Sequence, residues 1–170
     1  MTTSLDITDR KKSERELHNL AYFDQLTGLP NRSHLEKHAQ TLLTGEGERP
    51  FAFFLLDLDR FKSVNDTQGH TIGDQLLRQV AARLQSLLPH AGLIARLGGD
   101  EFAILHDVDD MNDAGELAEQ ITGGFVATFI LGDLVMTVGA SVGIAVSPGP
   151  ARTFQLRLKQ ADLALYRAMN

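Results

Sequence analysis

The chain has 170 residues, a formal net charge of −6 and no cysteine. This length favours one domain with a short appendage, and the lack of cysteine excludes disulfides and thiolate metal sites. The acidic balance argues against a broad basic surface for duplex nucleic acid, so we expect no nucleic-acid partner. No apolar run approaches the ~20 residues of a membrane span and the N-terminus is polar, so we expect no membrane segment and a cytoplasmic protein.

The hydrophobic spacing predicts helices that alternate with strands. In chain order, we expect a helix over 13–23, a helix over 31–43, a strand over 51–59, a helix over 72–88, strands over 93–97 and 102–105, a helix over 111–129, strands over 134–139 and 140–145, and a helix over 154–169. Residues 1–12 lack a helical period, and 60–71 is expected to be a polar connection. This order favours an α+β or α/β domain with helices packed against a sheet.

Acidic residues stand at the ends of two predicted strands. Asp57 and Asp59 end the first strand, and carboxylates beside a polar loop suit a hard metal ion, which prefers oxygen ligands. Asp100 and Glu101 follow two glycines that predict a hairpin turn. Adjacent strand residues point to opposite faces, so one of this second pair could share a metal with Asp57 while the other approaches a substrate differently. Taken alone, each pair is more often an ordinary strand end or turn.

The polar segment 60–74 holds candidates for binding a nucleotide. Backbone amides at the start of a helix after a strand form a phosphate cradle, and Lys62 could add a positive charge. A carboxylate and an amide suit guanine, which makes Asn65 and Asp74 candidates for reading that base. The alternatives are a solvated turn for Lys62 and Asn65, and helix capping for Asp74.

Four motifs occur in order along the chain: DQLTGLPNR at 24–32, DLDRFKSVND with GH and GD at 57–74, RLGGDEF at 96–102 and ADLALY at 161–166. The third resembles the signature that names the GGDEF family. The others resemble the opening motif, the nucleotide-binding block and the closing helix of that family. Four ordered blocks do not plausibly arise by chance, and the sequence is identified as a member of the GGDEF family.

This resemblance implies a fold and an activity. The fold is α+β, similar to nucleotidyl cyclase and polymerase palm domains, with a central, mainly antiparallel five-stranded sheet flanked by helices. The activity is that of a diguanylate cyclase, which condenses two GTP into cyclic di-GMP across a homodimer. The alternative is a catalytically weak GTP-binding regulatory module. Residues 21–170 would form the catalytic domain, and 1–20 a linker and signalling helix.

The resemblance also implies a metal and catalytic residues. Asp57 and Asp100, with the main-chain carbonyl of Leu58, would bind Mg²⁺, with Mn²⁺ as an alternative. Asp100 and Glu101 would be the catalytic residues. Glu101 would act either as a metal ligand or as an aid to deprotonating the attacking hydroxyl.

Four further residues would contact GTP by the same resemblance. The amides around Phe61 and Lys62, with the Lys62 ammonium, would hold phosphates. Asn65 and Asp74 would read guanine.

The chain departs from the family pattern at two places. Pro89 and Gly92 stand where many members have the Arg and Asp of a product-inhibition motif, so we expect no standard product inhibition there. Met169 replaces a phosphate-contacting Lys, and the Arg expected a few residues later falls beyond Asn170. We therefore expect weaker phosphate binding and a truncated C-terminus.

Residues 5–12 resemble the exit of a PAS sensory domain, so an upstream PAS-type sensor is expected, and a downstream EAL phosphodiesterase domain could follow in the full-length protein. His34 and His38, four residues apart, could bind zinc. Because no third ligand is close in sequence, a solvated helix face is favoured for this pair.

Overall fold

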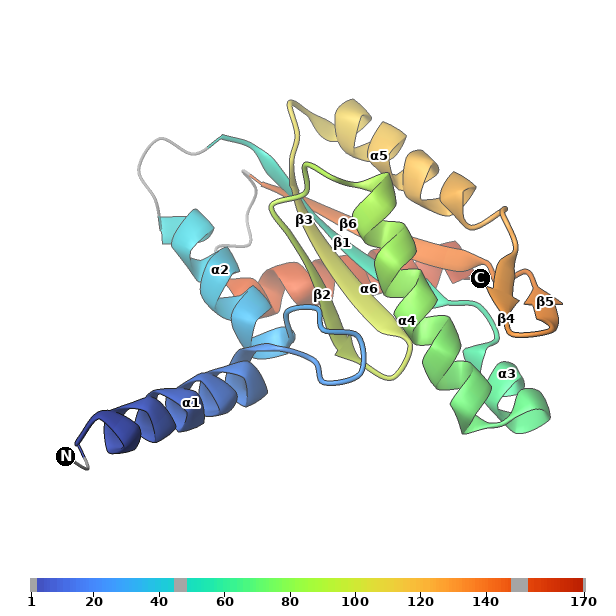
Figure 1. The fold of residues 1–170 in the computed structure, drawn as a ribbon. Helices are drawn as coiled ribbons and strands as arrows, with labels where there is room; N and C mark the ends of the chain where they lie inside the picture. The colour runs from blue at the N-terminus through green and yellow to red at the C-terminus, as the bar shows by residue number, and fades with distance from the viewer. Residues whose placement is uncertain (1–2, 45–48, 148–152, 170) are drawn as a thin grey trace.

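The computed structural model describes residues 3–44, 49–147 and 153–169, and Figure 1 shows how their helices and strands are arranged. In chain order these elements are α1 (Thr3–Tyr22), α2 (Arg32–Thr44), β1 (Phe51–Leu58), α3 (Phe61–Gln68), α4 (His70–Leu87), β2 (Leu93–Gly98), β3 (Glu101–Asp107), α5 (Met111–Gly124), β4 (Phe129–Leu131), β5 (Leu134–Met136), β6 (Ala140–Ser147) and α6 (Phe154–Met169). Among the described residues, no helix is both long and apolar enough to cross a membrane.

The main sheet is antiparallel and has the strand order β2-β3-β1-β6. Side chains of the central strand β1 alternate between two hydrophobic clusters, as strand geometry requires. Phe53 and Leu55 pack with residues of α2 and α6, and Phe54 and Leu56 pack with residues of α4 and α5. The sheet is therefore covered on both faces, with α4 and α5 in front of it and α6 behind it in Figure 1.

The expected α+β architecture, a mainly antiparallel sheet flanked by helices, is confirmed, but the number of strands in the sheet is not five. The described residues form a four-stranded sheet and a separate two-stranded hairpin of β4 and β5. The helix expected over 111–129 ends at Gly124. At Gly124 a Cβ would overlap the Leu87 side chain, so this glycine allows the end of α5 to approach α4 closely. Phe129 then belongs to β4 and is fully buried there.

Two segments expected to be irregular are helical. The polar connection 60–71 contains α3, in which Phe61 is buried, and Gly69 with a φ of 88° separates α3 from α4. Helix α1 begins at Thr3 instead of Ser13. None of its described residues is buried, and the apolar spacing that predicted a helix from residue 13 is lacking in the first 12 residues.

Candidate active site

Strand pairing brings the two predicted acidic segments together at one edge of the sheet. In the β1–β3 ladder, Asp57 lies directly opposite Glu101. The Leu58 amide donates a hydrogen bond to the Asp100 carbonyl over 3.3 Å. The end of β1 and the turn between β2 and β3 are therefore neighbours, as the sequence predicted.

The Asp57 carboxyl is in an unfavourable environment for its charge. Burial, a hydrogen-bonding contact with the Asp100 carboxyl and the negative charges of Asp100, Glu101 and Asp59 together raise the pKa of Asp57 to about 7. Its Oδ1 atom is buried without a hydrogen-bond partner. The pKa of Glu101 is also raised, by burial and by the charge of Asp100. This cluster of negative charge would be relieved by a bound cation.

The carboxyl pair fits a small hard cation that keeps other ligands. Nowhere in residues 3–44, 49–147 and 153–169 are three or more His, Cys, Asp or Glu side chains placed to hold a metal ion. Asp57 and Asp100 supply two carboxylates, the number commonly used for Mg²⁺ bound together with substrate phosphates. The unpartnered oxygen of Asp57 is the observation that supports this fit.

Asp59, the second acidic residue of the first predicted pair, makes hydrogen bonds to the segment that leads into β6. The Ser141 hydroxyl donates to Asp59 Oδ1 over 2.8 Å, and the Asp59 amide donates to the Gly139 carbonyl over 2.9 Å. A Cβ at Gly139 would lie 2.7 Å from Asp59 Oδ2. Asp59 therefore ties the end of β1 to the start of β6.

The start of α3 leaves backbone amides free for an anion. Arg60, the N-cap residue, has a left-handed backbone with a φ of 58°, and no side chain caps the helix. The first intrahelical bond runs from the Val64 amide to the Arg60 carbonyl, so it does not use the amides of Phe61 and Lys62. Phe61 is buried beneath this turn and Lys62 is exposed above it. Uncapped amides and a helix N-terminus suit phosphate.

The candidate guanine-reading residues lie on α3 and α4, which pack against each other. Asn65 Oδ1 is buried without a partner. A Cβ at Gly73 would overlap that atom, so the Asn65 amide lies directly on the backbone of Gly73. Asp74 is the next residue along α4 and is exposed. The glycine thus makes room for the amide beside the carboxylate.

Comparison with known proteins decides the family. The family model described as diguanylate cyclase, GGDEF domain, matches residues 21–170 of the sequence. The chain belongs to the GGDEF family. It is 42% identical over 169 residues to the signaling protein YkoW of Bacillus subtilis, a match that covers 96% of this chain and 21% of YkoW. It is 38% identical over 168 residues to MucR of Pseudomonas aeruginosa, named a bifunctional diguanylate cyclase/cyclic di-GMP phosphodiesterase, covering 98% of this chain and 24% of MucR.

The fold agrees with that of solved GGDEF domains. The GGDEF domain of TpbB (YfiN) from Pseudomonas aeruginosa superposes with a TM-score of 0.81 at 37% identity, covering 86% of this chain and 88% of that one. The present chain spans about a quarter or less of the two curated relatives above. The comparison therefore concerns the GGDEF domain, not the whole of those proteins.

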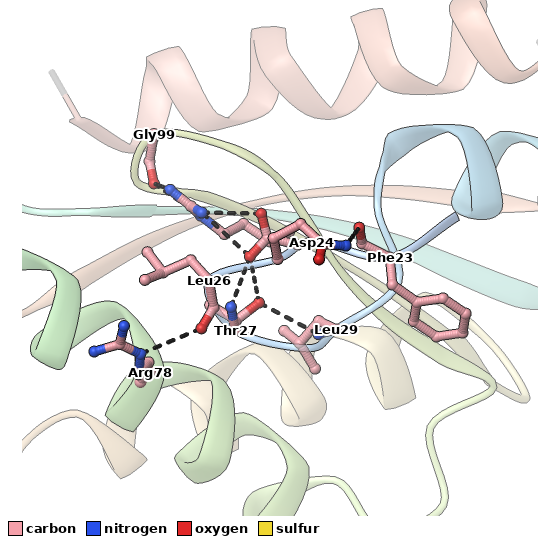
Figure 2. A network of polar contacts seen from close by, with 9 residues as sticks. Phe23, Asp24, Leu26, Thr27, Leu29, Arg78 and Gly99 are labelled. Atoms are coloured by element: carbon pink, nitrogen blue, oxygen red, sulfur yellow. Dashed lines mark hydrogen bonds and ion pairs between the residues drawn. The ribbon is translucent and has the colours of Figure 1, made fainter. Parts of the chain in front are cut away.

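A partly buried ion pair holds the signature turn of this GGDEF domain in place (Figure 2). Arg96 Nη1 lies 3.0 Å from Asp24 Oδ1, and Arg96 Nη2 donates to the Gly99 carbonyl over 2.8 Å. Thr27 donates to Asp24 through its amide and its hydroxyl. Burial alone would raise the pKa of Asp24, but the hydrogen bonds from Thr27 and the contact with Arg96 outweigh it and lower that pKa.

Sequence reasoning assigned Asp24 and Arg96 no role, although both lie in motifs that resemble the family. They are 72 residues apart, and spacing along the chain cannot show that they meet. Their one signal is position, because each flanks a glycine-containing turn. Together they link the opening motif to the turn that carries Asp100 and Glu101.

Proposed function

We propose that this GGDEF domain is a diguanylate cyclase that condenses two GTP into cyclic di-GMP and releases pyrophosphate. The proposal rests on one observation: strand pairing places Asp57 opposite Glu101 and joins the Leu58 amide to the Asp100 carbonyl, so three carboxyls gather at one end of the sheet. Such a group of carboxyls is costly to maintain without a cation, and a divalent cation bound together with a triphosphate would supply the missing positive charge. The family match supports the same activity.

Asp57, Asp100 and the Leu58 carbonyl would hold Mg²⁺ or Mn²⁺. When bound, such an ion offsets phosphate charge and stabilises charge that develops on attacking and leaving oxygens. The Asp57 oxygen that has no hydrogen-bond partner would then become a ligand.

GTP would lie across the start of α3. The uncapped amides of Phe61 and Lys62 would bind phosphate oxygens, and the exposed Lys62 ammonium would add a positive charge. Asn65 and Asp74 would bind the guanine edge from the junction of α3 and α4. The triphosphate would then lie at the N-terminus of α3, and the base would lie where α3 packs on α4.

In the reaction, the 3′-oxygen of one GTP would attack the α-phosphorus of the other. A new O–P bond forms, the bond to pyrophosphate breaks, and the hydroxyl proton must leave. Glu101 would assist that deprotonation from its position opposite Asp57 in the β1–β3 ladder. One domain holds one GTP, so two copies must face each other, and positioning within this homodimer supplies much of the rate.

The test is to incubate the dimerised domain with GTP and Mg²⁺ and to measure cyclic di-GMP. We expect product from the wild type and none from Asp100→Ala, with the fold of the variant retained by circular dichroism. Tight GTP binding without product would favour the alternative, a regulatory GTP-binding module. An unfolded Asp100→Ala variant would show that this carboxylate is structural.

We also propose that the full-length protein joins this domain to an upstream PAS-type sensor, and an EAL domain is a candidate for a segment downstream. The short share of YkoW and MucR that this chain spans leaves room for such domains.

A further inference from the structure

A cavity of about 280 Å³ lies between α1 and α2. Its lining combines basic, aromatic and hydroxyl side chains: His18, Tyr22, His34, Lys37, His38 and Thr41. No third ligand lies close in sequence to His34 and His38. Folding supplies one, because His18 of α1 lines the same cavity. None of the residues that carry the proposed cyclase activity lines it.

The cavity favours an anion. None of the described residues that line it is acidic, although the protein as a whole has a charge of −6. Glu36, which lies on α2 next to Lys37, is engaged elsewhere, because its Oε1 accepts a hydrogen bond of 3.1 Å from Gln155 of α6. The Lys37 ammonium lies 5.2 Å from the centre of the Tyr22 ring, at the wall of the cavity. A lysine and three imidazoles provide only positive or hydrogen-bonding groups for an anion.

The same wall offers aromatic surface. Tyr22 and His34 meet edge-on with ring centres 5.9 Å apart, and Phe23 supports His34 from a ring centre 5.3 Å away. A ligand with a flat apolar ring could pack on this aromatic surface while its anionic group binds the Lys37 ammonium.

Three histidines more often bind a transition metal, but two observations argue against one here. Within the described part of the chain, these rings do not form a group placed to hold an ion. The Lys37 ammonium beside them would also repel a cation. An anion is attracted by the same charge.

We propose that the cavity between α1 and α2 binds a small aromatic phosphate, with Lys37 and the imidazoles on the phosphate and Tyr22 against the ring. This inference does not depend on the proposed cyclase activity. Because one wall comes from α1 and the other from α2, an occupied cavity would hold the N-terminal helix against the domain. Binding would therefore stabilise the folded chain.

The test uses the full chain and phenyl phosphate, with the imidazole signals of uniformly ¹⁵N-labelled protein as the readout. We expect saturable shifts of the His18, His34 and His38 rings and weaker binding of inorganic phosphate. Lys37→Met, which keeps the length of an exposed side chain, should weaken binding by about tenfold, the loss expected for one charge-assisted hydrogen bond. Lys12→Met removes the same charge from an exposed position on α1 outside the cavity, and it should leave affinity unchanged.

Several results would overturn the proposal. Chemical shifts that never saturate would indicate only general attraction of anions. An equal loss of affinity for phenyl phosphate in Lys37→Met and Lys12→Met would indicate the same. Equal affinity for inorganic phosphate and phenyl phosphate would show that the cavity does not recognise an aromatic ring, which would overturn the proposed ligand class. Saturable Zn²⁺ binding that shifts all three rings and displaces phenyl phosphate would make the cavity a metal site instead. His38→Gln provides a second variant, and unchanged binding in both Lys37→Met and His38→Gln would also overturn it.

Discussion

Arg96 binds Asp24 through one guanidinium nitrogen, Nη1, which lies 3.0 Å and 3.2 Å from the two carboxylate oxygens. The same guanidinium donates to the Gly99 carbonyl through Nε over 3.2 Å and Nη2 over 2.8 Å. The pair is well shielded, with side-chain exposures of 12% for Arg96 and 18% for Asp24. A single side chain therefore fixes the opening motif against the signature turn.

Removing this link should both destabilise the domain and loosen the turn. We expect Arg96→Met to lower the free energy of unfolding by about 2–3 kcal/mol, since it leaves a shielded carboxylate without its cation. A double-mutant cycle with Asp24→Asn, measured by urea unfolding, should show clear coupling between the two sites. The exposed pair Arg10 and Glu14 is the matched control and should show no measurable coupling. Additive effects of Arg96→Met and Asp24→Asn would contradict the role of the pair.

Local sequence patterns predicted those parts of the fold in which the spacing of apolar residues reflects burial. The apolar run at Phe51–Leu58 and the helical period of α4 identify a buried strand and an amphipathic helix without any tertiary information. The two glycines before Asp100 likewise predict the hairpin. Because that hairpin pairs with β1, the meeting of its carboxylates with Asp57 was within reach of sequence reasoning.

The remaining features depend on contacts that no local pattern encodes. Helix α3 is polar in composition, and its helical state depends on burying Phe61 and on the left-handed Arg60 before it. Strand β4 begins at Phe129, where periodicity alone extended a helix, whereas its partner β5 lies within the strand expected over 134–139. The partner of Asp24 lies 72 residues away, so only the folded chain reveals it.

The raised pKa of Asp57 predicts how stability depends on pH. The folded-state pKa is about 7 and the ordinary value is 3.8, so the folded state binds this proton more tightly than the unfolded state. The free energy of unfolding should therefore fall as pH rises between these values and lose no more above them. Asp57→Asn should stabilise the metal-free protein by about 1–2 kcal/mol at about pH 8, after allowance for solvent screening, and by little near pH 4.

Thermal unfolding across this range, with and without Mg²⁺, measures the effect. Mg²⁺ should raise the melting temperature of the wild type at about pH 8, where the carboxyl is ionised, and should have little effect on Asp57→Asn. A metal-free Asp57→Asn variant less stable than the wild type at that pH would contradict the account of this carboxyl.

Pro89 and Gly92 stand in place of the Arg and Asp of the product-inhibition motif. We therefore predict that cyclic di-GMP does not inhibit this domain through that motif. Neither residue offers a charged side chain for a dinucleotide, and Gly92 is exposed at the start of β2. We expect turnover that stays constant as cyclic di-GMP is added at micromolar concentrations, measured by continuous release of pyrophosphate. Micromolar binding of cyclic di-GMP that disappears when 89–92 is substituted would show the prediction to be wrong.

The contact between Asn65 and Gly73 predicts a variant that separates binding from stability. A Cβ at position 73 would overlap Asn65 Oδ1, and the end of a flexible side chain can move aside at small cost. Gly73→Ala should therefore displace the amide from its place beside Asp74 while leaving the fold intact. We expect the KM for GTP to rise by about tenfold, the effect of losing one or two hydrogen bonds to the base, with a smaller change in kcat.

Gly115→Ala is the matched control, because Gly115 also lies inside a helix but a Cβ there would meet no atom within 4 Å. That substitution should stabilise the protein by about 0.5–1 kcal/mol through helix propensity and leave KM unchanged. If Gly73→Ala left KM unchanged as well, the Asn65 amide would have no part in reading the base. If Gly73→Ala unfolded the domain, the contact between Asn65 and Gly73 would be structural. Guanine binding would then be tested with the Asn65→Ala variant instead. Both glycines lie inside helices, but only at Gly73 would a Cβ overlap the Asn65 amide, so the difference in KM between the two variants tests the placement of that amide.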